Sequence, residues 1–132
     1  MDQQLEERLR VYEQENLASP DIVNFVRGIL LWLEQTSHHS CTEESVGTLA
    51  SHLMLALARV SRGEELGPAW DPTVHEEAMS LTPLISWAEH IRCKAKQDLG
   101  LMLPPEEFDF LLLHLGAFLL HYNDPLLSQE NQ

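Results

Sequence analysis

The chain of 132 residues has the length of one domain, and its 44% of hydrophobic residues suffice for a folded core, which excludes a disordered acidic tail. Its 21 Asp and Glu outnumber its 8 Lys and Arg, for a formal net charge of −13. Such a charge disfavours direct binding to nucleic acid or to an anionic membrane surface, because both need clustered Lys and Arg.

Apolar residues recur at helical spacing along almost the whole chain, and no useful stretch alternates with the period of a strand. Residues 1–18 are expected to form a short N-terminal amphipathic helix. The Ser-Pro-Asp run at 19–21 predicts the start of a second helix, with Ser as N-cap, Pro in the first turn and Asp at the positive end of the helix dipole. A polar break follows at 35–40.

The third helix is expected to begin at a capping box, Ser40-Cys-Thr-Glu43, with Thr42 as a competing N-cap, and to end near Gly63. Residues 63–70 are the clearest predicted loop, because they hold two Gly and one Pro.

In the second half of the chain, Asp71-Pro72 predicts a short helix and Thr82-Pro83 predicts a longer one that stops at Gly100. The Pro- and Glu-rich run 103–107 opens a last helix, from Phe108 to about Tyr122, and 128–132 reads as a polar tail. The predicted fold is therefore all-α, a compact bundle of five to six mostly antiparallel helices, with one helical domain over 19–127.

No segment for export or for a membrane span is visible. The acidic N-terminus lacks the apolar stretch of a signal peptide, and the apolar run 110–120 is about half the length of a membrane span and contains His114. Cys41 and Cys93 lack metal-binding spacing and are expected to be reduced thiols, so we expect a cytoplasmic protein without membrane contact.

The common catalytic signatures are missing, because the chain has no phosphate-binding Gly loop, no GxSxG and no CxxC. His75-Glu76-Glu77 begins like a zinc-protease motif, but the second His is absent and Met79 takes its place. We interpret His38 and His39 as a solvated surface pair in a polar loop. We therefore expect no enzyme, no cofactor and no bound metal.

Two other histidines, His52 and His114, lie in similar apolar surroundings that fit L-x-x-H-L-x-x-x-L. Residues seven apart form a nearly straight line on a helix, so Arg59 aligns with His52, and Glu107 and His121 align with His114. Each His is either a half-buried core residue satisfied by a neighbouring helix or a phosphoryl acceptor, because neutral imidazole is a nucleophile near pH 7. Since a phosphoryl group adds close to two negative charges, Arg59 is the candidate cation for His52.

Two motifs carry a resemblance to a known family. The first is His52-Leu-Met-Leu-Ala-Leu-Ala-Arg59, and the second is Gly100-Leu-Met-Leu-Pro104-Pro-Glu106-Glu107-Phe-Asp-Phe-Leu-Leu-Leu-His114-Leu115. In order and spacing, residues from about 45 to 122 resemble a PTS regulation domain (PRD), the helical module through which the bacterial phosphotransferase system controls transcriptional antiterminators and activators.

The resemblance implies a five-helix bundle, commonly dimeric, in which His52 and His114 accept phosphoryl groups from the phosphocarrier protein HPr or from the EIIB component of a sugar transporter. Arg59, Glu107 and His121 would be supporting polar residues. Phosphorylation in the family shifts the dimer interface and switches an attached effector domain. Because only about 18 residues, with an excess of acidic side chains, precede Pro20, we expect a stand-alone copy that acts on another transcription regulator.

One departure from the family motivates an alternative. Family members often carry Asp directly before the first His, where this chain has Ser51. The alternative is a helical dimerisation or interaction module that has lost phosphorylation.

Two features of the sequence can indicate binding partners. Trp32 and Met54 lie off the main apolar stripes of their helices and suggest a homodimer, although they can also pack inside. Arg92, Lys94 and Lys96 form a basic cluster, either a helix C-terminus that complements its dipole or a docking patch for an acidic partner.

Overall fold

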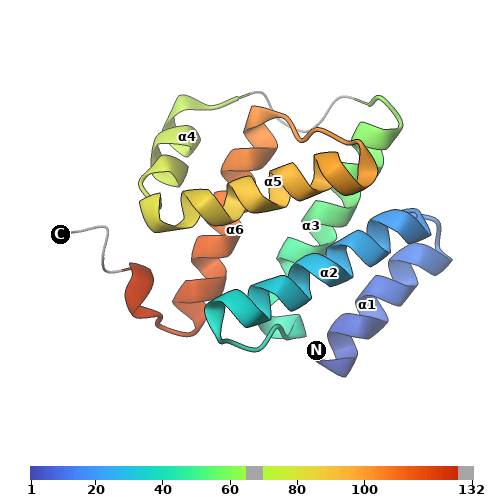
Figure 1. Cartoon of the computed structure of the whole chain (residues 1–132), viewed down its shortest axis with the longest axis horizontal. Coiled ribbons are helices and arrows are strands. Elements are labelled where there is room, and N and C mark those ends of the chain that lie inside the picture. The colour runs from blue at the N-terminus through green and yellow to red at the C-terminus, as the bar shows by residue number, and fades with distance from the viewer. Residues whose placement is uncertain (65–69, 128–132) are drawn as a thin grey trace.

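Each helix that the sequence predicts is present in the structure, close to its predicted position. The computed structural model describes residues 1–64 and 70–127, and within these ranges six α-helices, short 3-10 turns and no strand are present (Figure 1). The elements are α1 (Gln3–Gln14), α2 (Pro20–Ser37), α3 (Glu43–Ser61), α4 (Pro72–Met79), the 3-10 turn η1 (Thr82–Leu84), α5 (Ile85–Leu99) and α6 (Pro105–His121). The all-α fold class is confirmed. The predicted tail 128–132 and residues 65–69 of the predicted loop lie outside the described residues.

Helix α2 begins where the sequence predicts and ends later. Ser19 is its N-cap, and the Ser19 hydroxyl accepts a hydrogen bond from the backbone N–H of Ile22. The helix continues to Ser37 and stops at His38, whose left-handed backbone (φ 63°) breaks the helical hydrogen-bond pattern. The first half of the predicted polar break, residues 35–37, is thus helical.

The capping box of α3 differs from the predicted one. Thr42, the competing candidate, is the N-cap, and Ser45 rather than Glu43 is its partner. The Thr42 hydroxyl accepts from the N–H of Ser45 at 3.0 Å, and the Ser45 hydroxyl accepts from the N–H of Thr42 at 2.9 Å. The box centred on Ser40 and Glu43 is wrong because Glu43 is already the first residue of the helix and its side chain turns to Arg8.

The starts of the later helices also shift slightly. Residues 82–84 form a 3-10 turn, so the regular helix α5 begins at Ile85, and Gly100 ends it with a left-handed backbone (φ 66°). Helix α6 begins at Pro105, three residues before the predicted start, because proline suits the first helical turn.

Helix α6 lies centrally in the bundle and packs against α3, α4 and α5 (Figure 1). Six of its apolar side chains are buried, and each contributes about 1.5–3 kcal/mol when removed from water. The buried apolar residues of α6 are Phe108, Leu111, Leu112, Leu115, Phe118 and Leu119. The same packing buries two acidic residues of α6, Glu107 and Asp109, between neighbouring helices.

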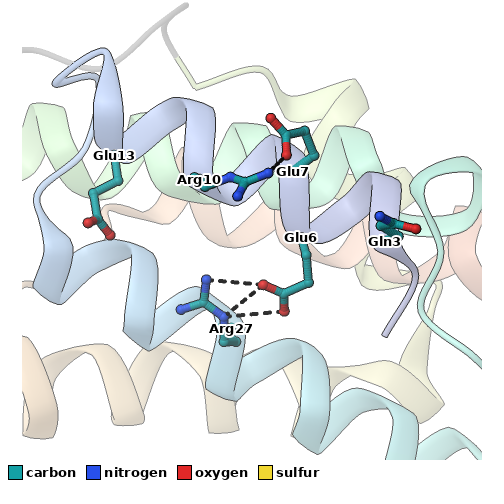
Figure 2. Close-up of a pocket in the computed structure, with 6 residues that line it drawn as sticks. All are labelled: Gln3, Glu6, Glu7, Arg10, Glu13 and Arg27. Carbon is teal, nitrogen blue, oxygen red and sulfur yellow. Dashed lines mark hydrogen bonds and ion pairs between the residues drawn. The ribbon is translucent and has the colours of Figure 1, made fainter.

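Helix α1 belongs to the same core. Leu5 and Leu9 are fully buried, and two ion pairs tie the helix to its neighbours. Figure 2 shows Arg27 of α2 reaching toward Glu6 of α1, with Nη2 and Oε2 3.2 Å apart. Arg8 pairs with Glu43 of α3 at 2.6 Å.

The two side chains that suggested a homodimer pack within the chain. Met54 is fully buried in the core. The Trp32 ring stacks on His90 of α5 at 4.2 Å between centroids and meets Trp87 edge-on at 6.2 Å. Neither side chain therefore indicates a second subunit. None of the helices in the described ranges has the length and apolar character of a membrane span.

Candidate functional site

The two histidines singled out by the sequence lie next to each other in space. His52 is on α3 and His114 is on α6, and their ring centroids are 5.1 Å apart with the planes tilted by 44°. Both side chains are half-buried, and the ring of Phe110 lies 5.7 Å from that of His52. The polar lines predicted on the two helices therefore meet at these two histidines.

Glu107 completes this pair from the first turn of α6. Its Oε2 lies 2.5 Å from Nε2 of His52, and the glutamate is only 5% exposed. A buried carboxylate is costly without a hydrogen-bond donor, which the imidazole supplies. The start of α6 also places Glu107 at the positive end of the helix dipole. We call His52, Glu107 and His114 the histidine pair site.

In contrast to His52, His114 has no hydrogen-bond partner for its ring among the described residues. Burial lowers its pKa, the nearby His52 lowers it further, and the Glu107 charge offsets this in part. Among the described residues, no hydrogen bond to either of its ring nitrogens is found. At neutral pH the ring is therefore uncharged and presents a nitrogen lone pair, which makes it a competent nucleophile.

Arg59 and His121 do not join the site. Arg59 is exposed on α3, two turns beyond His52, and its charge instead contributes to lowering the pKa of Glu64, after the hydrogen bond and charge of Arg62. His121 is exposed at the end of α6, and its ring meets that of Tyr122 at 4.8 Å. Of the five predicted site residues, the structure thus brings His52, His114 and Glu107 together and leaves these two apart.

Ser51, the residue directly before His52, contacts a cation from another helix. Nη1 of Arg8 donates a hydrogen bond of 2.7 Å to the hydroxyl of Ser51, the residue directly before His52. Arg8 lies 43 residues away in sequence, so no spacing rule could have found it. The position that departs from the PRD pattern is thereby tied into the α1–α3 contact.

Two further histidines pair with acids, which the sequence did not indicate. His39 Nε2 lies 2.6 Å from Asp124 Oδ2, and its ring stacks on Tyr122 at 4.4 Å. The interpretation of His38 and His39 as a solvated pair is therefore wrong for His39, because Tyr122 and Asp124, which follow α6, partly cover it. His75 pairs with the buried Asp109.

The basic cluster of α5 is largely neutralised within its own helix. Arg92 pairs with Glu89 at 2.6 Å and lies 4.9 Å over the ring of Phe108, and Lys94 pairs with Asp98 at 3.4 Å. These contacts favour the helix-stabilising interpretation over a docking patch. Over residues 1–64 and 70–127, no group of three or more His, Cys, Asp or Glu side chains is arranged to hold a metal ion.

Comparison with protein-family models, with curated proteins and with solved structures finds no match for this chain. The PRD assignment therefore stays a prediction that rests on the two motifs.

Proposed function

We propose that this chain is a non-enzymatic regulatory protein of the PRD type, controlled by phosphorylation of His52, His114 or both through the bacterial phosphotransferase system. The observation that carries the proposal is the close approach of the two imidazoles, 5.1 Å between centroids, although 62 residues separate them (114 − 52). Two motifs that resemble the same family thus contribute to one place on the surface.

The reaction expected at this place is a phosphoryl transfer between nitrogens. The lone pair of a neutral imidazole attacks the phosphorus of a donor phosphohistidine, a new N–P bond forms, and the donor imidazole leaves with the electrons of the broken bond. Neutral His114 suits this attack, because burial and the neighbouring His52 hold its pKa down.

The product places a phosphate beside the buried carboxylate of Glu107. Since the phosphoryl group carries close to two negative charges, repulsion between the two anions strains the contact of His52 with Glu107. The His52 ring can turn from the carboxylate to the phosphate and donate a hydrogen bond to it, a contact that the exposed Arg59 does not offer. The contact between α3 and α6 would then rearrange, and this rearrangement is the proposed signal.

The partners follow from the resemblance. In the cytoplasm, HPr or a transporter EIIB component would act as the donor, and a homodimer would pass the signal to another transcription regulator. The net charge of −13 supports action through protein partners rather than by direct contact with nucleic acid.

The test is phosphorylation by the purified system. The protein is incubated with phosphoenolpyruvate, enzyme I and HPr, with and without EIIB, and phosphohistidine is mapped by peptide mass spectrometry at alkaline pH. We expect phosphate on the peptides that hold His52 or His114, and loss of each signal in His52→Gln and His114→Gln. His121→Gln, a change at an exposed histidine of the same helix, is the matched control. Absence of phosphate from both peptides would contradict the proposal.

A second candidate function has an observation of its own. Because Ser51 is bound by Arg8, the segment before His52 has the features of a helix contact, which favours an interaction module without phosphorylation. The phosphate mimics His52→Asp and His114→Asp separate the two candidates by sedimentation velocity. The regulatory proposal expects a change in the self-association of the protein, whereas the module expects none.

A further inference from the structure

Helix α4 carries a second imidazole–carboxylate contact, outside the histidine pair site. Nδ1 of His75 lies 3.0 Å from each carboxylate oxygen of Asp109. The Asp109 side chain is 4% exposed, whereas the His75 side chain is 42% exposed. A buried acid from α6 thus holds the inner nitrogen of a ring whose outer edge faces solvent.

The contact assigns the two nitrogens of His75 different roles. An ionised carboxylate only accepts hydrogen bonds, so Nδ1 must carry the proton that lies between His75 and Asp109. In the neutral ring, the lone pair then resides on Nε2, for which the described residues offer no hydrogen-bond partner. The ring of Trp70 lies 5.3 Å from the imidazole between centroids.

This arrangement is separate from the histidine pair site, although both begin in the same turn of α6. Glu107 and Asp109 are two residues apart, so their side chains leave the helix on opposite sides, about 200° around its axis. Glu107 engages His52 of α3, and Asp109 engages His75 of α4.

We propose that Nε2 of His75 is a further phosphoryl-acceptor site, with donors in which phosphorus is bound to nitrogen, and that Asp109 is its positioning residue. The donor class rests on the proposed function, whereas the site itself does not. His75 is also the residue of the incomplete zinc-protease motif, and the pairing with Asp109 gives this histidine a role that needs no second ligand.

The chemistry balances with a small donor such as phosphoramidate. The Nε2 lone pair forms the new N–P bond, the P–N bond of phosphoramidate breaks, and ammonia leaves with its electron pair. Attack by a neutral ring makes the imidazole cationic, and the Asp109 carboxylate at Nδ1 stabilises that positive charge. Carboxylates that orient histidine in hydrolytic triads have the same effect.

The acidic residues near His75 in the sequence either point away from its imidazole ring or are engaged in other hydrogen bonds. Glu76 and Glu77 are exposed and lie one and two residues further along α4, where side chains do not face the same side of a helix. Asp71 is engaged as the N-cap and accepts from the N–H groups of Thr73 and Val74. His75 itself lies at the end of the first turn of α4, where the helix dipole favours an added anion.

The experiment uses the full chain carrying His52→Gln and His114→Gln together, treated with potassium phosphoramidate. We expect phosphate on the peptide that contains His75, linked through Nε2, at a rate at least about tenfold above that of the exposed His121. In the same background, Asp109→Asn should lower the rate by about tenfold or more and should mix the Nε2- and Nδ1-linked products, because the amide no longer demands a proton on Nδ1. Circular dichroism confirms that each variant is folded.

Two outcomes would overturn the inference. One is labelling of His75 no faster than His121, and the other is mainly Nδ1-linked phosphate in the chain with intact Asp109. The linkage is read in that chain, so the second outcome stays decisive even if Asp109→Asn fails to fold. Since the background lacks both histidines of the pair site, this result and that of the phosphotransferase assay are independent.

Discussion

His52 of α3 and Glu107 of α6 form a hydrogen bond of 2.5 Å between an imidazole nitrogen and a carboxylate that is only 5% exposed. The bond joins two helices of the core at the point where His114 also approaches. The proposed phosphorylation of His52 would therefore disturb a contact that helps to hold the bundle together.

Replacing Glu107 by Gln removes the charge of this contact and keeps its shape. We expect the free energy of unfolding to fall by about 1–2 kcal/mol at pH 7, because hydrogen bonds to charged groups contribute more than neutral ones. Urea denaturation measures the change. Glu106→Gln is the matched control, since Glu106 shares the first turn of α6 and forms no ion pair in the described structure. Equal losses in the two variants would mean that the helix dipole, not His52, explains the effect.

The lowered pKa of His114 predicts how stability depends on pH. Burial, then His52, makes protonation of His114 harder in the folded chain than in the unfolded one. The unfolded state therefore binds more protons as the pH falls below about 6.5, so this residue makes the protein less stable in that range until the folded ring is protonated too.

His114→Gln should flatten this part of the pH profile. Thermal unfolding at several pH values between about 7 and 5 measures the slope of stability against pH around the ordinary histidine pKa. A slope unchanged from that of the natural chain would contradict the buried position of His114. His121→Gln, at the exposed end of the same helix, is the parallel control.

The two cysteines should react very differently with thiol reagents. Burial raises the pKa of Cys41 to about 12, with a further contribution from Glu34, whereas Cys93 is exposed on α5. Only the thiolate reacts, so native protein at pH 8 should be alkylated once, at Cys93, and unfolded protein twice. Mass spectrometry after iodoacetamide treatment counts the additions. Rapid alkylation of native Cys41 would show that the loop before α3 is not packed as described.

Two glycines should respond in opposite ways to alanine. A methyl group at Gly28 in α2 meets no atom within 4 Å, so Gly28→Ala should stabilise the helix by about 0.5–1 kcal/mol. At Gly116 in α6 the same methyl group comes within 3.0 Å of Leu81 Cδ1, and overpacking of this kind costs about 1–3 kcal/mol.

We therefore expect Gly116→Ala to lower the midpoint of thermal unfolding and Gly28→Ala to raise it. If both raise it, the Leu81 side chain moves aside from the added methyl group, and the expected overpacking at Gly116 is contradicted.

The sequence predicts local features well because their causes are local. Ser19 caps α2 three residues ahead of Ile22, and Gly100 ends α5 because it accepts a left-handed backbone without a steric cost. The start of α3 is harder to predict from local rules, because both Ser40 and Thr42 are suitable N-cap residues. The structure shows that Thr42 is the N-cap and that Ser45 forms the capping box with it.

In the candidate site, too, relationships within one helix can be predicted from the sequence, whereas contacts between helices cannot. The alignment of Glu107 with His114 follows from the heptad spacing of one helix, but the hydrogen bond of Glu107 to His52 joins residues 55 apart. The bonds of His75 to Asp109 and of His39 to Asp124 span 34 and 85 residues. No sequence spacing distinguishes Asp109 and Asp124 from the other carboxylates of this acidic protein.

By itself, the sequence determines that this chain forms helices, where most of them begin and end, and that His52 and His114 occupy similar apolar stripes. Only the tertiary structure decides that the two histidines meet, that Glu107 and Asp109 are buried with one imidazole each, and that Arg59 and His121 stay outside. The physical reason is that periodicity sets which face of a helix is buried, whereas the rotation and crossing of packed helices set which residues on two faces touch.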